Sequence, residues 1–339
     1  MRWWGLWAAL LVAGFLYSAW PRTYAYRRVV AIGDLHGDYD QALEILRATH
    51  VVDERSHWDG GDTVLVSTGD TVDRGDATIK LYEMFQRLRT ESGKAGGQVV
   101  TLLGNHEVMN ALGDWRYVTP GDLASFGGHD ARRHAMSTDG WLGREWLTHY
   151  AVTASVPLLD TQAESLAPAL SRTHRASFVH GGISPVWAQL GTDSINAHAH
   201  GLLRKALTSR PSNGMLPGDA LREERALWAA DGPLWYRGYA LDAERDACAN
   251  ADHARRTLDV QSLIMGHTPQ MGGIARRCAD DRLYIIDTGM SHAYGGRASA
   301  LEIASYLRRG WFGTMCVHST YTAVYAREGA QRLSHTVHC

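Results

Sequence analysis

The chain of 339 residues lacks any excess of charge of one sign. Its formal charge is −2, and Lys and Arg form no cluster larger than pairs such as Arg27 with Arg28 and Arg132 with Arg133. The lack of a basic patch excludes a general nucleic-acid-binding surface. Internal repeats and low-complexity tracts are also missing, and an apolar content of 45% is enough to bury a large core. We therefore expect one large α/β domain whose partner carries a small charged group.

Cysteine is scarce. The four cysteines lie in the last third of the chain and outside every motif described below, at Cys248, Cys278, Cys316 and Cys339. We therefore assign them no role as ligands or nucleophiles. An even count behind a secretory-type segment permits disulfides in any of three pairings. We favour Cys248 with Cys278 and Cys316 with Cys339, and buried free thiols remain the open alternative.

One long apolar stretch follows Arg2 and covers residues 3–20. Its length lies between that of a signal-peptide core and that of a membrane-spanning helix. Thr23 and Ala25 match a cleavage site poorly, whereas basic residues downstream of the stretch disfavour an anchor. We expect residues 1–26 to be a signal peptide or a membrane anchor outside the fold. The expected location is the secretory pathway or a membrane, reached through residues 3–20, with the side of the membrane left open.

Apolar, β-rich runs alternate with amphipathic stretches in the first hundred residues. Residues 29–32, 63–66 and 99–103 are predicted to be buried strands, and residues 40–49 and 78–89 are predicted to be helices. This order of strand, loop and helix predicts a largely parallel sheet with helices on its faces. Ligands gather at the carboxyl ends of such strands, so the loops that follow them are the place to look for a site.

The rest of the chain is less regular. We predict a polar helical segment at residues 198–242 and an aromatic, Gly-rich insert at about 113–150 that lies over the site and has no regular element. The domain is expected to cover residues 27–330, with a C-terminal tail at 331–339. Further strands are predicted at residues 176–179, 263–265, 283–286 and 321–325.

Short blocks rich in metal-binding and acid–base side chains follow several of these strands. Each block alone is a weak signal. Together they supply carboxylate, amide and imidazole donors, a spare His with a spare Asp, and two arginines, which are the parts needed to break a phosphate ester between two cations. The blocks are GDLHGD at 33–38, GDTVDRG at 69–75, GNHE at 104–107, HGG at 180–182, GH at 266–267 and LWYRG at 234–238.

The order and wording of these blocks resemble the calcineurin-like metallophosphoesterases, and within them the phosphoprotein phosphatase family. Four phrases resemble its Shewanella-like protein phosphatase branch, namely LLGNHEVMNALGDWRYV, FVHGGISP, GPLWYRGYA and MGHTP. The resemblance covers roughly residues 28–300. It implies the α/β fold of that family, in which two β-sheets are sandwiched between helices (αββα).

The resemblance also implies a set of metal ligands. Asp34 and His36 would bind the first metal, Asp70 would bridge the two, and Asn105, His180 and His267 would complete the second. A bridging carboxylate suits a pair of cations that share one water and lower its pKa. Because the set lacks thiolates and mixes oxygen with imidazole donors, it suits Mn, Fe or Zn and excludes a structural zinc finger.

The same resemblance implies four catalytic residues. In the family, a metal-bridging hydroxide attacks the phosphorus in line, and the residue at the position of His106 protonates the leaving oxygen as general acid. Asp73 would hold the His106 ring, and Arg74 with Arg237 would clamp the phosphate oxygens. Leu103 stands where the commoner eukaryotic phosphatases carry an Arg before GNHE, and residues 290–339 hold no counterpart of their tail motif.

Other polar and aromatic residues near the blocks have less defined roles. A rim around the phosphate-carrying group and inward packing are both open for Trp115, Arg116 and Tyr117. For His292 and Tyr294, which follow a late strand, we favour a core or turn role over an approach to the metals. His129 and His134 are expected to be solvated.

Three functions are compatible with this pattern. The favoured one is a metal-dependent phosphomonoesterase of the Shewanella-like type, which acts on phosphorylated Ser/Thr or Tyr of a protein or on a small phosphoester, with no nucleic-acid partner. The alternatives are hydrolysis of a dinucleoside polyphosphate or other small phosphoanhydride, and a non-catalytic binding protein. Metals, substrate and oligomeric state are left open by the sequence.

Overall fold

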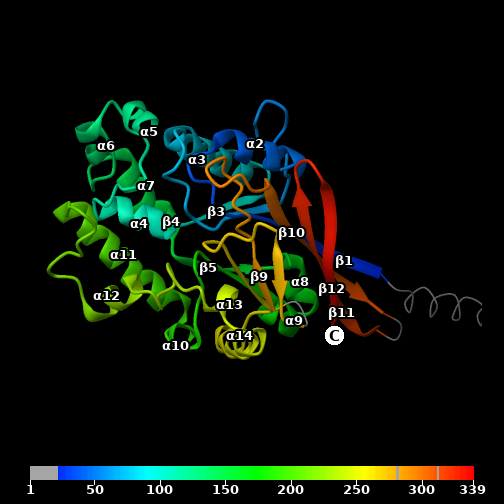
Figure 1. Ribbon diagram of the computed structural model, residues 1–339. Coiled ribbons are helices and arrows are strands. Elements are labelled where there is room, and N and C mark those ends of the chain that lie inside the picture. The colour runs from blue at the N-terminus through cyan, green and yellow to red at the C-terminus, as the bar shows by residue number, and fades with distance from the viewer. Residues whose placement is uncertain (1–21, 280–281, 311–312) are drawn as a thin grey trace, which may run out of the picture.

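The computed structural model of the chain describes residues 22–279, 282–310 and 313–339. These residues form two β-sheets that pack face to face, with helices on their outer faces (Figure 1). The α/β sandwich expected from the resemblance is therefore confirmed.

The larger sheet has seven strands in the order β12-β11-β10-β1-β2-β3-β4. Strands β1 to β4 run parallel to one another, whereas β10, β11 and β12 join the outer side of β1 as an antiparallel meander. The strands are β1 (Arg22–Ile32), β2 (Val64–Ser67), β3 (Gln98–Leu102), β4 (Tyr150–Ala151), β10 (Ser299–Arg309), β11 (Met315–Tyr325) and β12 (Gly329–His338).

The smaller sheet has five strands in the order β5-β6-β7-β9-β8. Its central strands β6, β7 and β9 are parallel, and antiparallel strands lie at both edges. The strands are β5 (Thr153–Pro157), β6 (Arg175–Val179), β7 (Ser262–Met265), β8 (Ala275–Arg277) and β9 (Leu283–Ile285).

Both sheets are covered on each face, which explains their continuous apolar runs. Along β1, Val29 and Ala31 face the second sheet, whereas Val30 and Ile32 face the outer helices, as the two-residue period of a strand requires. Outside the larger sheet lie α2 (Tyr39–Ala48) and α3 (Thr78–Lys94), and outside the smaller sheet lies α14 (Glu244–Leu258) (Figure 1). The short helices α8 (Thr161–Leu166) and α9 (Pro168–Thr173) pack instead against β1, β10 and β11 of the larger sheet.

The first strand begins earlier than the sequence predicts. β1 starts at Arg22, and residues 22–26 pair with the end of β10, so this part of the predicted leader belongs to the sheet. The predicted tail at 331–339 also lies within β12 except for Cys339. The reason is the same at both ends, because polar strands that are partly exposed carry too little apolar alternation to be recognised.

The predicted secretory or membrane-anchored location is wrong. Within the described parts of the chain, no helix has the length and the apolar character needed to cross a bilayer. The apolar stretch at residues 3–20, on which that prediction depended, lies outside the described residues.

The predicted irregular insert is helical. It contains α5 (Pro120–Ser125), α6 (His129–Ala135) and α7 (Trp141–His149), and α4 (Asn105–Ala111) leads into it. Helices of six to nine residues are too short to show a clear helical period, which is why the sequence pattern missed them. A local signal was present, since Thr119 caps α5 and Pro120 occupies its first turn.

A second helical segment lies beside this insert (Figure 1). It comprises α10 (Pro185–Ala188), α11 (Gly191–Ser209) and α12 (Arg222–Trp228), and α13 (Gly238–Leu241) leads from it to α14. We call residues 113–149 and 191–228 together the helical cap. Their helices gather at one end of the sandwich, opposite β10 to β12 (Figure 1).

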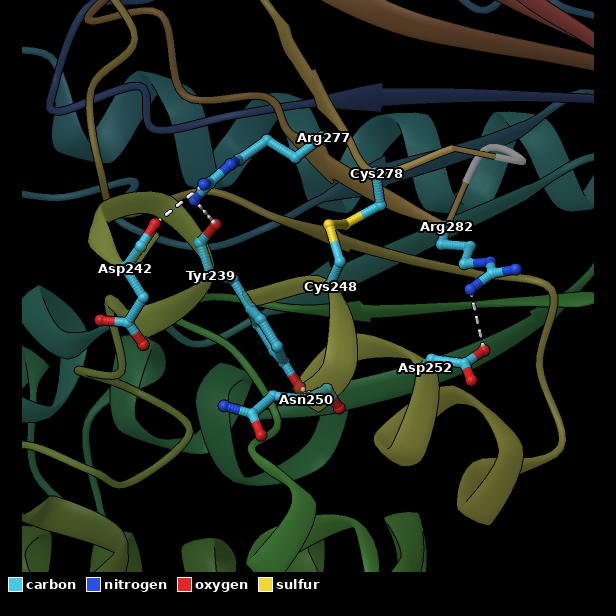
Figure 2. The surroundings of a disulfide bond; sticks show 8 residues. All are labelled: Tyr239, Asp242, Cys248, Asn250, Asp252, Arg277, Cys278 and Arg282. Carbon is cyan, nitrogen blue, oxygen red and sulfur yellow. Dashed lines mark hydrogen bonds and ion pairs between the residues drawn. A yellow bond between two sulfur atoms is a disulfide. The ribbon is translucent and has the colours of Figure 1, made fainter. Parts of the chain in front are cut away.

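Two disulfides form, with the pairing that we favoured. Cys248 on α14 joins Cys278, which follows β8, and Cys316 on β11 joins the last residue, Cys339. Next to the first bond, Arg277 donates to the carbonyl oxygens of Tyr239 and Asp242 (Figure 2). This disulfide therefore ties α14 to a strand end that also holds α13.

Candidate metal centre

The polar blocks lie in the loops that follow parallel strands of both sheets. The loop after β1 carries Asp34 and His36, the loop after β2 carries Asp70, and Asn105 begins α4 after β3. In the smaller sheet, His180 and His267 follow β6 and β7. Because parallel strands end at the same edge, these five loops meet at one place.

Glycines allow the loops of the larger sheet to touch. A Cβ on Gly37 would lie 2.6 Å from the backbone of Gly75, and a Cβ on Gly69 would lie 2.4 Å from the backbone of Gly104. Such approaches are open only to residues without a side chain. The loops are joined as well, since the N–H groups of Leu35 and His36 both donate to the carbonyl of Asp70.

Several site residues have left-handed backbones. His36, Asp70, Asp73, Arg74 and His267 all have φ between 46° and 71°. Side chains with a Cβ rarely adopt this region, and each such residue costs on the order of 1–3 kcal/mol. Strain of this kind persists where the surrounding structure fixes it, and it is concentrated at functional sites.

Glu107 fixes two of these loops to each other. Its buried carboxylate accepts from the N–H groups of Asp70, Thr71 and Gly104 and from the hydroxyl of Tyr82. With four donors, this carboxylate is satisfied, and within the described part of the chain it takes no part in a cluster of potential metal ligands. Glu107 belongs to the GNHE block, but its role depends on neighbours that only the fold brings to it.

The side-chain donors converge on one oxygen of Asp70. Its Oδ2 lies 3.3 Å from His180 Nε2, 3.7 Å from His36 Nε2 and 3.8 Å from His106 Nε2. Asn105 Oδ1 lies 2.9 Å from the same His180 nitrogen. Among the described residues, two groups place their donor atoms within 4.8 Å of one another, and both share Asp70: one with His36 and His106, the other with His180 and His267. Asp70 therefore lies at the centre of this donor cluster.

The hydrogen bonds of His36, His180 and His267 fit metal ligation, and so do the pKa values of His36 and His267. At His180 burial is outweighed by the charge of Asp70, which raises the pKa. The Nδ1–H groups of His36 and His180 donate to backbone carbonyls, which leaves the Nε2 lone pair of each ring toward Asp70. The Nε2 of His267 is buried without a hydrogen-bond partner. Burial lowers the pKa of His36 to about 4, and burial with the charges of His180 and Arg237 lowers that of His267 to about 2. Both rings are therefore neutral, as a metal requires.

Negative charge accumulates beside these rings. Asp34 accepts from the N–H of His267 at 3.1 Å, and burial followed by the charges of Asp287 and Asp70 raises the pKa of Asp34 well above its ordinary value. Burial also raises the pKa of Asp287 to about 6. Buried carboxylates that repel one another are stabilised by cations. The His and Asp side chains grouped around Asp70 therefore fit metal binding, and Asp287, which no sequence motif indicated, adds to the charge that would hold the ions.

The predicted acid–base pair forms beside this cluster. His106 Nδ1 lies 2.6 Å from Asp73 Oδ2, and both side chains are buried. His106 is in one of the donor clusters by distance, but its bond to Asp73 matches the expected role as an acid.

Both predicted arginines border the cavity into which the donor cluster opens. Arg74 lies over the rings of Tyr117 and Tyr294, at 4.3 and 4.9 Å. Arg237 donates through Nη1 to the carbonyl of His267 at 2.9 Å and to the hydroxyl of Thr268 at 3.2 Å. These contacts fix both side chains next to the donor cluster.

The donor cluster opens into a cavity of about 420 Å³. Arg116 and Tyr117 lie on its wall, as the rim interpretation expected, whereas Trp115 packs against His129 and Arg132. Tyr294 also lies on the wall, contrary to the core or turn role that we favoured. Further wall residues, which no sequence motif indicated, are Met109, Asp114, Asn213, Gly214, Trp228 and Trp235.

The remaining histidines lie outside the cavity. His292 is exposed and pairs with Asp38 at 2.5 Å, so the expectation that it does not approach the metals is consistent with the structure. His129 and His134 are exposed, as expected.

Known proteins share this architecture. Residues 27–271 match the family model of the calcineurin-like phosphoesterases. An uncharacterized protein of Schizosaccharomyces pombe is 40% identical over 280 residues, which cover 81% of this chain and 77% of that protein. Shewanella-like protein phosphatase 2 of Arabidopsis thaliana is 29% identical over 321 residues, covering 81% and 75%. The solved structure of a cold-active protein-tyrosine phosphatase of a psychrophilic Shewanella has a TM-score of 0.67 at 23% identity, over 91% of this chain and 80% of that one.

The chain belongs to the calcineurin-like phosphoesterase family. It is a metal-dependent hydrolase of phosphomonoesters, and the resemblance to the Shewanella-like phosphatase branch is confirmed by the curated relatives. The alternative of a non-catalytic binding protein is thereby disfavoured, since every residue of the predicted centre is present.

Proposed function

We propose that this phosphoesterase removes phosphate from Ser/Thr or Tyr side chains of proteins, with a pair of Mn, Fe or Zn ions as cofactors. The proposal depends on one observation above all. His106, whose ring is held by the buried Asp73, borders the same cavity as Arg74, Arg237 and the donor cluster around Asp70. The names of the Shewanella-like relatives support a phosphoprotein as substrate.

Arg74 and Arg237 hold the phosphate. Both side chains are anchored by neighbouring groups, so their guanidinium groups are oriented before the substrate arrives. Planar guanidinium groups bind phosphate oxygens bidentately and offset the charge that spreads over them in the transition state. The metals, when bound, supply a water of lowered pKa and further positive charge.

His106 protonates the leaving oxygen. Burial opposes its protonation, but the charge of Asp70 and the hydrogen bond that His106 donates to Asp73 outweigh burial and raise the pKa of His106 above its ordinary value. With Nδ1 held by Asp73, the protonated ring directs its Nε2–H toward the cavity. A serine or threonine alkoxide is a poor leaving group, so delivery of this proton contributes about 10²–10⁴-fold to the rate.

Substitutions at the bridge and at the acid test this proposal. The Mn-loaded protein is expected to hydrolyse p-nitrophenyl phosphate and phosphopeptides, and Asp70→Asn is expected to reduce the rate by at least about a hundred-fold. His106→Asn should reduce hydrolysis of phosphoserine peptides similarly. His292→Asn, which changes an exposed histidine outside the cavity, is the matched control and should retain activity. Unchanged rates in both site variants would refute the proposal.

A competition assay distinguishes the proposed phosphoprotein phosphatase from the alternative, a hydrolase of small phosphoanhydrides. Phosphopeptides and diadenosine tetraphosphate are offered together to the same Mn-loaded protein. Preferred cleavage of the phosphopeptides is expected, whereas preferred cleavage of the polyphosphate would favour a phosphoanhydride hydrolase built on the same centre.

A further inference from the structure

A chain of buried polar contacts leads from His106 into the helical cap. Behind the ring, Asp73 is completely buried, and its Oδ1 accepts from the Nδ2 of Asn110 at 2.9 Å. The Oδ1 of Asn110 in turn accepts from Nη1 of Arg132 at 2.7 Å. Arg132 therefore stands at the end of a sequence of directed hydrogen bonds that begins at the acid.

Each contact in this chain has only one orientation. A guanidinium can donate but cannot accept, so Arg132 fixes the carbonyl end of the Asn110 amide. The NH₂ end must then face away from it, where it donates to Asp73 Oδ1 and to the carbonyl of His106. As a result, the other oxygen of Asp73 is aimed at His106 Nδ1.

Arg132 is itself held rigidly by the cap. It comes from α6, is 0% exposed, and donates through Nε to the buried Asp122 of α5 at 3.1 Å. The rings of Trp115 and Phe126 lie 4.9 and 5.3 Å from its guanidinium carbon. Its Nη2 is 3.9 Å from Asp73 Oδ1, so its charge also faces the carboxylate that His106 uses.

We propose that Arg132 and Asn110 are positioning residues, which orient Asp73 and through it the His106 ring for proton donation to the leaving oxygen. Neither residue lines the cavity, so neither contacts the phosphate. The inference rests on the proposed function, because it concerns the general acid of that reaction. It gives the helical cap a part in the chemistry in addition to its part in shaping the cavity.

Substrates that differ in leaving group test this role. A 2,4-dinitrophenolate leaves without a proton, whereas phenolate and the serine alkoxide need one. In the Mn-loaded full-length protein, Arg132→Met is expected to lower kcat for phenyl phosphate and a phosphoserine peptide by about a hundred-fold. On 2,4-dinitrophenyl phosphate the loss should stay below about three-fold, with KM unchanged on all three substrates.

Two further variants keep the test decisive if Arg132→Met does not fold. Asn110→Ser interrupts the series of hydrogen bonds between Arg132 and Asp73. The loss of kcat in this variant is expected to depend on the leaving group in the same way. Arg132→Lys retains a donor for Asn110 but loses the fork that also reaches Asp122, so partial recovery is expected. Arg89→Lys is the control for a weakened ion pair, since Arg89 bonds Glu145 at 2.7 Å away from His106. It should leave the leaving-group dependence as in the wild type.

The outcomes are distinct. Equal losses on good and poor leaving groups in both Arg132→Met and Asn110→Ser, or no loss at all, would overturn the positioning role while the proposed function stands. A wild-type protein that hydrolyses none of the three substrates would instead refute the proposed function itself.

Discussion

The strand-end loops and the helical cap build the same cavity by different means. In the loops, backbone contacts between Gly37 and Gly75 and between Gly69 and Gly104 fix the positions of the donors. In the cap, short helices are held by side chains such as Arg132 and Asp122. Loops built from tight turns can therefore be predicted from the sequence, because such turns require particular residues. The helical cap cannot, because its arrangement depends on side-chain packing.

The largest effect is expected in the loops. His267→Ala removes a buried nitrogen that has no hydrogen-bond partner, so we expect loss of bound metal and a fall in kcat of more than about a hundred-fold. Metal analysis of the purified variant and assays with added Mn measure both. A variant with full metal content and near-normal kcat would show that the loops do not hold the cations.

Exchange of the phosphate-binding arginines should have the next largest effect. Arg237→Lys keeps the charge but loses the planar fork, so kcat/KM for phosphopeptides is expected to fall by about 10- to 100-fold, the equivalent of a charged hydrogen bond. Arg74→Lys, at a side chain stacked between two tyrosines, should give a similar loss. Wild-type kinetics in either variant would remove that residue from the site.

The disulfide on the smaller sheet should matter more for stability than for rate. It closes a loop of 30 residues, and its removal in Cys248→Ser/Cys278→Ser is expected to lower the free energy of unfolding by about 3–4 kcal/mol. Arg277, beside Cys278, holds the carbonyls at the end of α13, which directly follows Arg237, so KM should rise by only about two- to three-fold (Figure 2). Denaturation curves and kinetics of the same samples measure the loss of stability and the rise of KM. A change of kcat without a change of stability would contradict a mainly stabilising role of this disulfide.

The smallest effect is expected at the rim of the cap. Arg116 is 64% exposed and forms a two-pronged ion pair with Asp114 at the cavity wall. Exposed pairs are worth at most about 1 kcal/mol, so Arg116→Ala should change kcat/KM for a phosphopeptide by less than about five-fold. Hydrolysis of p-nitrophenyl phosphate, which has no peptide, should stay the same. A loss above a hundred-fold would mean that the cap contacts the phosphate itself.

The sequence predicted the three strands that lead into the first loops, because an apolar run followed by Gly and Asp specifies both a buried strand and its turn. The six metal ligands were implied by the resemblance. The structure brings these residues to one place, and their binding of metal stays a prediction. The roles of Glu107, Asn110 and Arg132 could not be predicted, since each depends on which side chains the fold brings near it. Tyr294 was misplaced for the same reason, because a tyrosine after a strand packs inward or lines a cavity without any difference in local pattern.

The left-handed backbones of the five site residues restrict how this chain can change through descent. Val, Ile and Thr are excluded at these positions by their shape, before any question of chemistry arises. Asparagine would ease the conformation, and glycine would relieve it fully. A descendant lineage that no longer needed the reaction would be expected to drift toward glycine or asparagine at His36, Asp70, Asp73, Arg74 and His267, so such replacements in a relative would mark the loss of catalysis.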